Sequence, residues 1–154
     1  MNYSKYLLGI ANMIENTRCE VYSDEKFKEL ESSAMRLGSA FQKVNFLRDL
    51  KTDYEDLNRT YFPNTDLSKL DECSKNEIIK EIEADFQAGL EGILKLPIEA
   101  KFGVYTAYRY YKRLLTRLKT TPSTEIKNAR IRVPDYQKVE LLARCYVKYR
   151  LNLL

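Results

Sequence analysis

The stretch "FQKVNFLRDLKTDYEDLNRTYFP", residues 41–63, combines apolar residues at helical spacing with polar residues that recur one turn apart. On a helical wheel at about 100° per residue, residues 37–57 separate into two faces. The wide apolar arc contains Leu37, Phe41, Val44, Leu47, Leu50, Tyr54 and Leu57. A strip roughly 80° wide contains Gly38, Gln42, Asn45, Asp49, Asp53 and Asp56. The pattern predicts an amphipathic helix with one face that carries mainly amide and carboxylate oxygens.

That oxygen-rich strip has two interpretations. A solvated helix face usually mixes opposite charges at i,i+4, whereas Asp49 and Asp53 are like charges that repel by a few tenths of a kcal/mol. A divalent cation would offset this repulsion, and Mg²⁺ prefers oxygen ligands that it shares with substrate phosphates. Arg48 lies beside the strip and has the fork geometry that suits a phosphate. Spacing alone does not separate a metal site from a polar helix face. Lys43 falls within the apolar arc instead.

The rest of the chain also predicts helices. With 5 Gly and 4 Pro in 154 residues, turn signals are sparse, which favours long helices over a sheet. Ser74 and Glu77 have the spacing of a capping box at the start of one helix. The predicted helices cover 4–16, 25–57, 75–95, 98–119 and Pro134 to about 153, and the predicted loops cover 58–73 and 123–133. For 25–57, the alternative to one continuous helix is an interruption around Gly38 and Ser39. The expected fold class is all-α, a helical bundle that forms a single domain over residues 1–154.

Composition limits the chemistry. The absence of histidine excludes histidine triads and imidazole general bases. Cys19, Cys73 and Cys145 have no metal-ligand spacing and predict free thiols in a reducing cytoplasm. No apolar run approaches the roughly 20 residues that span a bilayer, and the N-terminus lacks a secretory signal. We therefore expect a cytoplasmic protein.

The charge is distributed unevenly. Residues 101–154 hold 13 Lys/Arg against 3 Asp/Glu, whereas residues 1–100 hold 13 against 19. This asymmetry suits a metal–phosphate ligand, and equally a nucleic-acid or anionic-membrane surface. No established nucleic-acid-binding fold accompanies the basic, tyrosine-rich segment at 107–119, so we expect no nucleic-acid partner. The final helix carries Lys138, Arg144, Lys148 and Arg150 and is a candidate for peripheral membrane contact; the alternative is a core helix with a basic outer face.

One set of residues matches a known pattern. The pattern is Q-x-x-N-x-x-R-D-x-x-x-D, followed by an arginine and Y-x-P, and it comprises Gln42, Asn45, Arg48, Asp49, Asp53, Arg59, Tyr61 and Pro63. It resembles the second aspartate-rich motif of the squalene/phytoene synthase family, and the sequence around the motif is most like that of bacterial phytoene synthases. The resemblance implies an isoprenoid synthase fold. It also implies Mg²⁺-dependent head-to-head condensation of two prenyl diphosphates, such as geranylgeranyl or farnesyl diphosphate, in carotenoid or terpenoid biosynthesis.

The same resemblance implies roles for individual residues. Asn45, Asp49 and Asp53 would hold Mg²⁺, with Mn²⁺ as a second candidate, and Asp49, Asp53 and Arg48 would be the catalytic groups. The residues that would contact the diphosphate are Gln42, Arg48, Arg59, Tyr111 and Arg130. Tyr111 opens "YKRLL" and Arg130 lies in "ARIRVP", which resemble the family's tyrosine helix and terminal arginine segment.

Each of three diphosphate contacts has a structural alternative. Tyr111 shares a helix face with Tyr105 and Tyr108 and is equally interpretable as a core tyrosine. The alternative for Arg130 is a solvated loop charge. Arg59 could instead be a structural partner of Asp53 or Asp56.

The resemblance covers residues 20–154 and corresponds to the C-terminal half of a family member. No D-x-x-x-D pair precedes Asp49, so we expect residues 1–19 to be a diverged or foreign start and the chain alone to be incomplete or inactive. Exposed walls of the cavity would favour self-association or a partner that supplies the N-terminal half. The alternative function is a non-catalytic helical binding or interaction module derived from the same fold.

Overall fold

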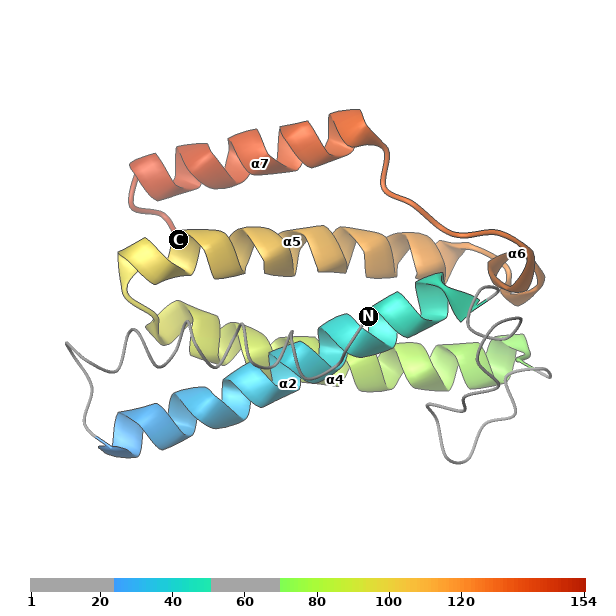
Figure 1. The fold of residues 1–154 in the computed structure, drawn as a ribbon, viewed down its shortest axis with the longest axis horizontal. Coiled ribbons are helices and arrows are strands. Elements are labelled where there is room, and N and C mark those ends of the chain that lie inside the picture. Colours follow the sequence, from blue (N-terminus) through green and yellow to red (C-terminus); the bar gives the residue numbers. More distant parts are fainter. Residues whose placement is uncertain (1–23, 51–69) are drawn as a thin grey trace.

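The computed structural model describes residues 24–50 and 70–154, and in these ranges the chain forms helices and no strand. The helices are α2 (Asp24–Arg48), α4 (Glu72–Lys95), α5 (Ile98–Thr120), α6 (Ser123–Asn128) and α7 (Asp135–Arg150) (Figure 1). The predicted all-α class is therefore confirmed. The helix predicted over residues 4–16 lies outside the described ranges.

The long helices form a bundle in which α5 is central. α2 crosses α4 and packs mainly against it, and α5 contacts α4, α2 and α7 (Figure 1). α7 lies on the side of α5 that faces away from α4. The C-terminal end of α2 thereby comes close to α5 and to the segment between α6 and α7, and these elements form the candidate site.

The apolar arc predicted for the first long helix faces the core of the bundle. Its described members are all buried: Leu37, Phe41, Val44, Leu47 and Leu50. α2 stops at Arg48, Asp49 forms a turn, and Leu50 is helical again. The continuous helix predicted through this position is therefore interrupted at Asp49, and residues 51–57 lie outside the described part of the chain.

The next helix, α4, presents Ile78, Ile79, Ile82 and Phe86 to the core, as their spacing predicts. Its start is different from the prediction. Oδ1 of Asp71 accepts a hydrogen bond of 2.7 Å from the backbone N–H of Ser74, which makes Asp71 the N-cap. This hydrogen bond is the main reason why the pKa of Asp71 is lowered. The predicted capping box at Ser74 was wrong, because an acceptor three residues earlier satisfies the first turn.

Two glycines allow α2 and α4 to approach each other closely. A Cβ atom added at Gly89 would lie 2.9 Å from Cβ of Leu37, and one added at Gly92 would collide with Cβ of Ser33. Real Cβ atoms do not pack this closely. The absence of a side chain at both positions therefore sets the separation of the two helices.

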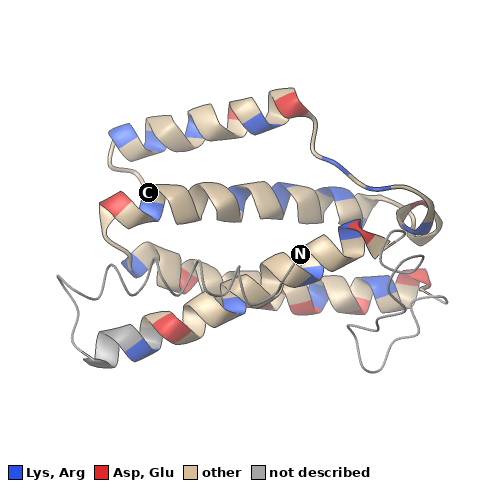
Figure 2. Ribbon diagram, in the orientation of Figure 1, with Lys and Arg blue, Asp and Glu red and all other residues tan. Residues whose placement is uncertain are grey.

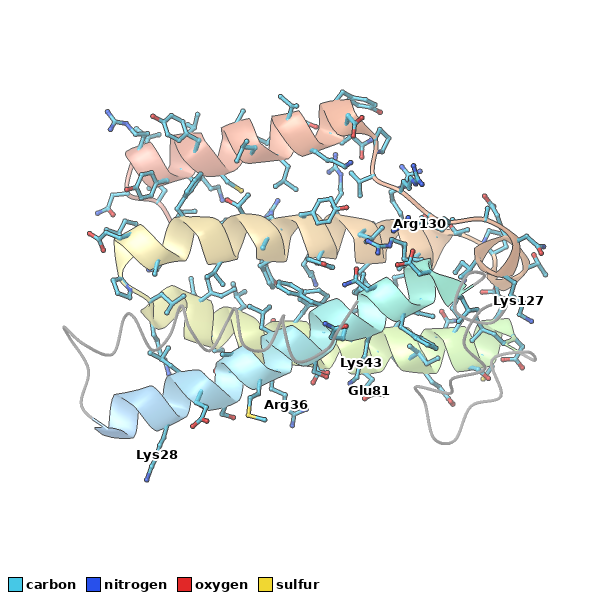
Figure 3. The ribbon with its side chains drawn as sticks, viewed as in Figure 1. Lys28, Arg36, Lys43, Glu81, Lys127 and Arg130 are labelled. Carbon is cyan, nitrogen blue, oxygen red and sulfur yellow. The ribbon has the colours of Figure 1, made fainter. Side chains whose placement is uncertain are left out.

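A buried ion cluster also joins these two helices. Asp85 of α4 is 1% exposed, and its carboxylate accepts hydrogen bonds from Arg36 (2.9 Å), Ser39 (3.0 Å) and Lys43 (2.7 Å) of α2. Figure 3 shows Lys43 beside Glu81, its second acidic partner. Lys43 is the lysine that falls within the apolar arc of the sequence, and its position is explained by these two counter-ions on α4.

The C-terminal region departs from prediction in two ways. Residues 123–128 form the short helix α6 after Pro122, where a loop over 123–133 was predicted, and its Ile126 is fully buried. α7 ends at Arg150 rather than near residue 153. Its only buried residue is Cys145, and Phe102 of α5 packs against Tyr149 with ring centroids 5.1 Å apart.

Candidate metal and diphosphate site

The site begins with the last turn of α2. The backbone N–H of Asp49 donates a 2.9 Å hydrogen bond to the carbonyl oxygen of Asn45, so the two side chains lie one helical turn apart. Asn45, Arg48 and Asp49 are all partly buried. Gln42, nearly one turn before Asn45, is partly buried as well. The described part of the oxygen-rich strip, from Gln42 to Asp49, is therefore partly shielded from solvent by the bundle.

Tyr111 of α5 closes one side of this turn. Its hydroxyl accepts a 3.1 Å hydrogen bond from Nδ2 of Asn45. Its ring stacks on Phe41 with a centroid separation of 4.1 Å and an interplanar angle of 18°. Tyr111 is thus a core tyrosine through its ring, and its hydroxyl contacts Asn45 at the candidate site, so the two interpretations of the sequence are compatible.

Two arginines hold the carboxylate of Asp49. Oδ1 accepts a 3.1 Å hydrogen bond from Nε of Arg48 and lies 2.7 Å from Nε of Arg130, while Oδ2 pairs with the terminal nitrogen of Arg48. Figure 3 places Arg130 beside the C-terminal end of α2. The hydrogen bond with Asp49 raises the pKa of the Arg48 guanidinium against the opposing effect of burial. Arg130 is half-exposed and ion-paired, so it is not simply a solvated loop charge.

Of the eight predicted site residues, six lie in the described ranges. Five of these six are joined by the contacts above: Asn45, Arg48, Asp49, Tyr111 and Arg130. Gln42 lies on the same helix without joining these contacts in the described part of the chain. Asp53 and Arg59 lie outside the described residues, as do both structural alternatives for Arg59. Their predicted roles stay predictions.

The donor set fits a hard divalent cation in part. Oδ1 of Asn45 is buried and has no hydrogen-bond partner among the described residues, which leaves a carbonyl oxygen available as a ligand. The carboxylate of Asp49 lies one turn away and is 22% exposed. Amide and carboxylate oxygens are ligands that Mg²⁺ accepts while it keeps several waters. Within residues 24–50 and 70–154, no group of three or more acidic or cysteine side chains forms a complete cation site.

Charge changes sign across the site. Figure 2 shows a basic and an acidic segment side by side at the C-terminal end of α2, and Lys and Arg are prominent along α5. The sequence has Arg48 and Asp49 at that end of α2. Arg130 reaches Asp49 from the basic C-terminal half of the chain. Amide and carboxylate oxygens are therefore adjacent to a pair of guanidinium groups, a combination that would suit a cation–diphosphate pair.

Comparison with known families gives the class of this all-α bundle, which is the isoprenoid synthase fold. Residues 2–137 match the family model described as squalene/phytoene synthase, and the chain belongs to that family. Members of this family act on prenyl diphosphates. The match begins at residue 2, so it includes most of the segment that the motif resemblance leaves out. No solved structure matches the chain.

The motif does not include the Asp85 cluster, which holds α2 against α4. A signal for it exists in the sequence. Asp85 occupies the apolar face of its helix between Ile82 and Phe86, and Lys43 occupies the apolar arc of the other helix. Two opposite charges on two apolar faces predict a buried pair between those helices, because a buried charge needs a partner.

Proposed function

We propose that this chain binds the diphosphate group of a prenyl diphosphate together with Mg²⁺, as part of a head-to-head prenyltransferase of the phytoene synthase type. Geranylgeranyl and farnesyl diphosphate are the candidate substrates, and carotenoid or terpenoid biosynthesis is the expected context. The observation that carries the proposal is the junction of three elements at one turn. Asn45 contacts Tyr111 at 3.1 Å, and Asp49 pairs with Arg130 at 2.7 Å.

Each side chain has a distinct part in the proposal. Asn45 and Asp49 would contribute oxygen ligands, with Asp53 as the third predicted ligand. Arg48 and Arg130 would donate hydrogen bonds to phosphate oxygens in fork geometry. Bound Mg²⁺, or Mn²⁺ as the second candidate, would neutralise negative charge on the departing diphosphate. Ionisation of an allylic diphosphate needs no general base to start, which is consistent with a chain that contains no histidine.

The chain carries one aspartate-rich motif, and we propose that turnover requires a second one supplied by a further segment or partner. Mixing the chain with an N-terminal half of a family member should produce Mg²⁺-dependent release of pyrophosphate. The Asp49→Asn variant should abolish that release, whereas Asp135→Asn, on the exposed first turn of α7, should not. The absence of pyrophosphate release from the unmutated pair would contradict catalysis.

A binding experiment separates the enzyme from the non-catalytic alternative. A prenyl thiodiphosphate, titrated calorimetrically in the presence of Mg²⁺, should bind the chain, and Asp49→Asn should weaken binding by at least about tenfold because a charged cation ligand is lost. Binding without pyrophosphate release on complementation would favour a non-catalytic module that retains the ligand site. No binding of the analogue at any Mg²⁺ concentration would contradict both versions of the diphosphate site.

The exposed apolar face of α7 favours an additional partner. It exposes a set of large apolar side chains, Tyr136, Val139, Leu142, Tyr146 and Val147, each at least half exposed. By helical geometry, Lys138 lies beside this apolar face on one edge and Arg144 on the other, while Lys148 lies on the opposite side of the helix. We propose peripheral contact of this face with an anionic membrane, because basic residues around an apolar helix face favour such surfaces. None of the described helices is long and apolar enough to cross a membrane.

A further inference from the structure

Both oxygens of the Asp49 carboxylate pair with the protein's own cations. Oδ1 contacts Nε of Arg48 at 3.1 Å and Nε of Arg130 at 2.7 Å, and Oδ2 pairs with Arg48. A cation that approached this carboxylate alone would meet two guanidinium groups at short range. Like charges at such distances repel strongly in a partly buried site. The predicted ligand is therefore poorly available to a free metal ion.

The position of Arg130 would allow its side chain to exchange one anionic partner for another. It lies in the extended segment between α6 and α7, where Ile131 and Val133 are buried and anchor the backbone. The side chain of Arg130 is 49% exposed, compared with 19% for Arg48. Its guanidinium can rotate away from Asp49 without moving the segment that carries it. A diphosphate, with more negative charge than a carboxylate, offers a stronger partner for the same fork of donors.

We propose that Arg130 is an exchangeable counter-ion, which neutralises Asp49 in the resting chain and transfers to the diphosphate when that group enters. The transfer frees Asp49 for the metal ion, with the buried Oδ1 of Asn45 one turn away. The inference rests on the proposed function of this site. It adds that metal and diphosphate bind as a coupled pair. By linkage, each then raises the affinity of the other by the same factor.

The first test measures the metal alone. Binding of Mn²⁺ without diphosphate is followed by loss of the free-ion signal in electron paramagnetic resonance. Arg130→Gln removes one positive charge beside Asp49 and should bind Mn²⁺ about fivefold more tightly than the unmutated chain. Arg132→Gln removes the same charge from the same segment, two residues further on, and should leave Mn²⁺ affinity unchanged. Arg130→Lys keeps the charge and should also resemble the unmutated chain.

The second test measures the coupling. Inorganic diphosphate is titrated calorimetrically into each chain with and without Mg²⁺, and the ratio of the two dissociation constants is the coupling factor. We expect a ratio of at least about tenfold for the unmutated chain and for Arg132→Gln. A ratio several-fold smaller is expected for Arg130→Gln. Direct complexation of Mg²⁺ by diphosphate contributes equally to every chain, so the comparison isolates Arg130.

The outcomes separate this inference from the proposed function. If Arg130→Gln binds Mn²⁺ no more tightly than Arg132→Gln, or keeps the full coupling factor, the exchange is wrong while the diphosphate site stands. If the unmutated chain binds diphosphate neither with nor without Mg²⁺, the proposed function is wrong and the exchange falls with it. Tighter Mn²⁺ binding together with reduced coupling in Arg130→Gln supports both.

Discussion

Asn45 of α2 donates a 3.1 Å hydrogen bond from Nδ2 to the hydroxyl oxygen of Tyr111 of α5, and this bond connects the oxygen-rich turn to the packed core. The ring of Tyr111 is held on its other side by Phe41, at a centroid separation of 4.1 Å. Core packing thus fixes the position of a polar group in the site. The ring and the hydroxyl can be separated experimentally.

Tyr111→Phe keeps the stacked ring and removes the hydroxyl. Because Asn45 then loses its acceptor in a partly buried site, we expect the free energy of unfolding to fall by about 1–3 kcal/mol. Tyr111→Ala removes the ring as well and should cost about 3–5 kcal/mol. Urea unfolding measures both values, and the diphosphate affinity of Tyr111→Phe should fall although the core is intact. Equal stability of the Phe variant and the unmutated chain would show that the bond contributes nothing.

The same glycine-to-alanine substitution should have opposite effects at Gly92, in the contact between α2 and α4, and at Gly103, on an open part of α5. Gly92→Ala forces a Cβ atom against Ser33 and should destabilise the chain by about 1–3 kcal/mol, since the helices must separate. Gly103→Ala meets nothing within 4 Å and should stabilise α5 by up to about 1 kcal/mol through helix propensity. Thermal unfolding of the two variants provides the measurement. A stabilising effect at Gly92 would contradict the close approach.

The buried carboxylate of Asp85 predicts acid sensitivity. Burial raises its pKa, but hydrogen bonds from Lys43, Arg36 and Ser39 outweigh burial and lower it overall. A lowered folded pKa contributes stability that is present above the unfolded value of about 4 and is lost as pH falls through the folded value. The pKa of Lys43 is raised: burial lowers it, and the bonds to Asp85 and Glu81 more than compensate. Its contribution is present below about 10.4 and is lost at higher pH.

Asp85→Asn should therefore cost about 3 kcal/mol at pH 7, because it breaks a buried pair from one side. The difference from the unmutated chain should shrink as the pH is lowered below about 4. Glu83→Gln is the matched control. It removes an exposed pair with Lys119 at 2.9 Å and should cost less than about 1 kcal/mol. Urea unfolding across this pH range measures both. An Asp85→Asn deficit that stays constant on acidification would exclude the ionised carboxylate as its source.

The sequence predicts the long helices well because burial of apolar residues drives them, and their spacing records which residues are buried. Leu47 and Ile82, each on a predicted apolar face, are fully buried in the structure. Short elements carry too little pattern for this. α6 has six residues, less than two turns, so no periodicity distinguishes it from a loop. The start of α4 depends on which of two neighbouring oxygens reaches the first turn, and spacing permits both Asp71 and Ser74.

The candidate site also has features that the sequence predicts and features that it does not. Placement of Asn45 and Asp49 on one helix face is a local property and follows from their spacing. The pairing of Asp49 with Arg130 is a tertiary contact. The motif resemblance assigns both residues to one metal–diphosphate site but does not predict that they pair with each other. Whether an apolar helix face points to the core or to solvent is also decided by tertiary packing. Val139 and Tyr146 have helical spacing whether they face the core or solvent, and in α7 they are exposed.

That outward face of α7 leads to the last prediction. If it contacts an anionic membrane, the chain should float with vesicles that contain phosphatidylglycerol, remain free of pure phosphatidylcholine vesicles, and dissociate as salt is raised. Val147→Asp places a charge on the apolar face and should lower vesicle binding by about tenfold. Leu94→Asp is the matched control, because Leu94 and Val147 are both 54% exposed and Leu94 lies on α4.

Three results would contradict contact with a specifically anionic membrane. Equal flotation with neutral and anionic vesicles would remove the role of the basic residues. A dimer by light scattering that Val147→Asp disrupts would identify a second copy of the chain as the occupant. Tight, sequence-selective binding of a nucleic acid would reverse the expectation drawn from the basic, tyrosine-rich segment. Selective loss of vesicle binding in Val147→Asp, with Leu94→Asp unaffected, supports the membrane because the two substitutions add the same charge at equal exposure and differ only in the helix that carries it.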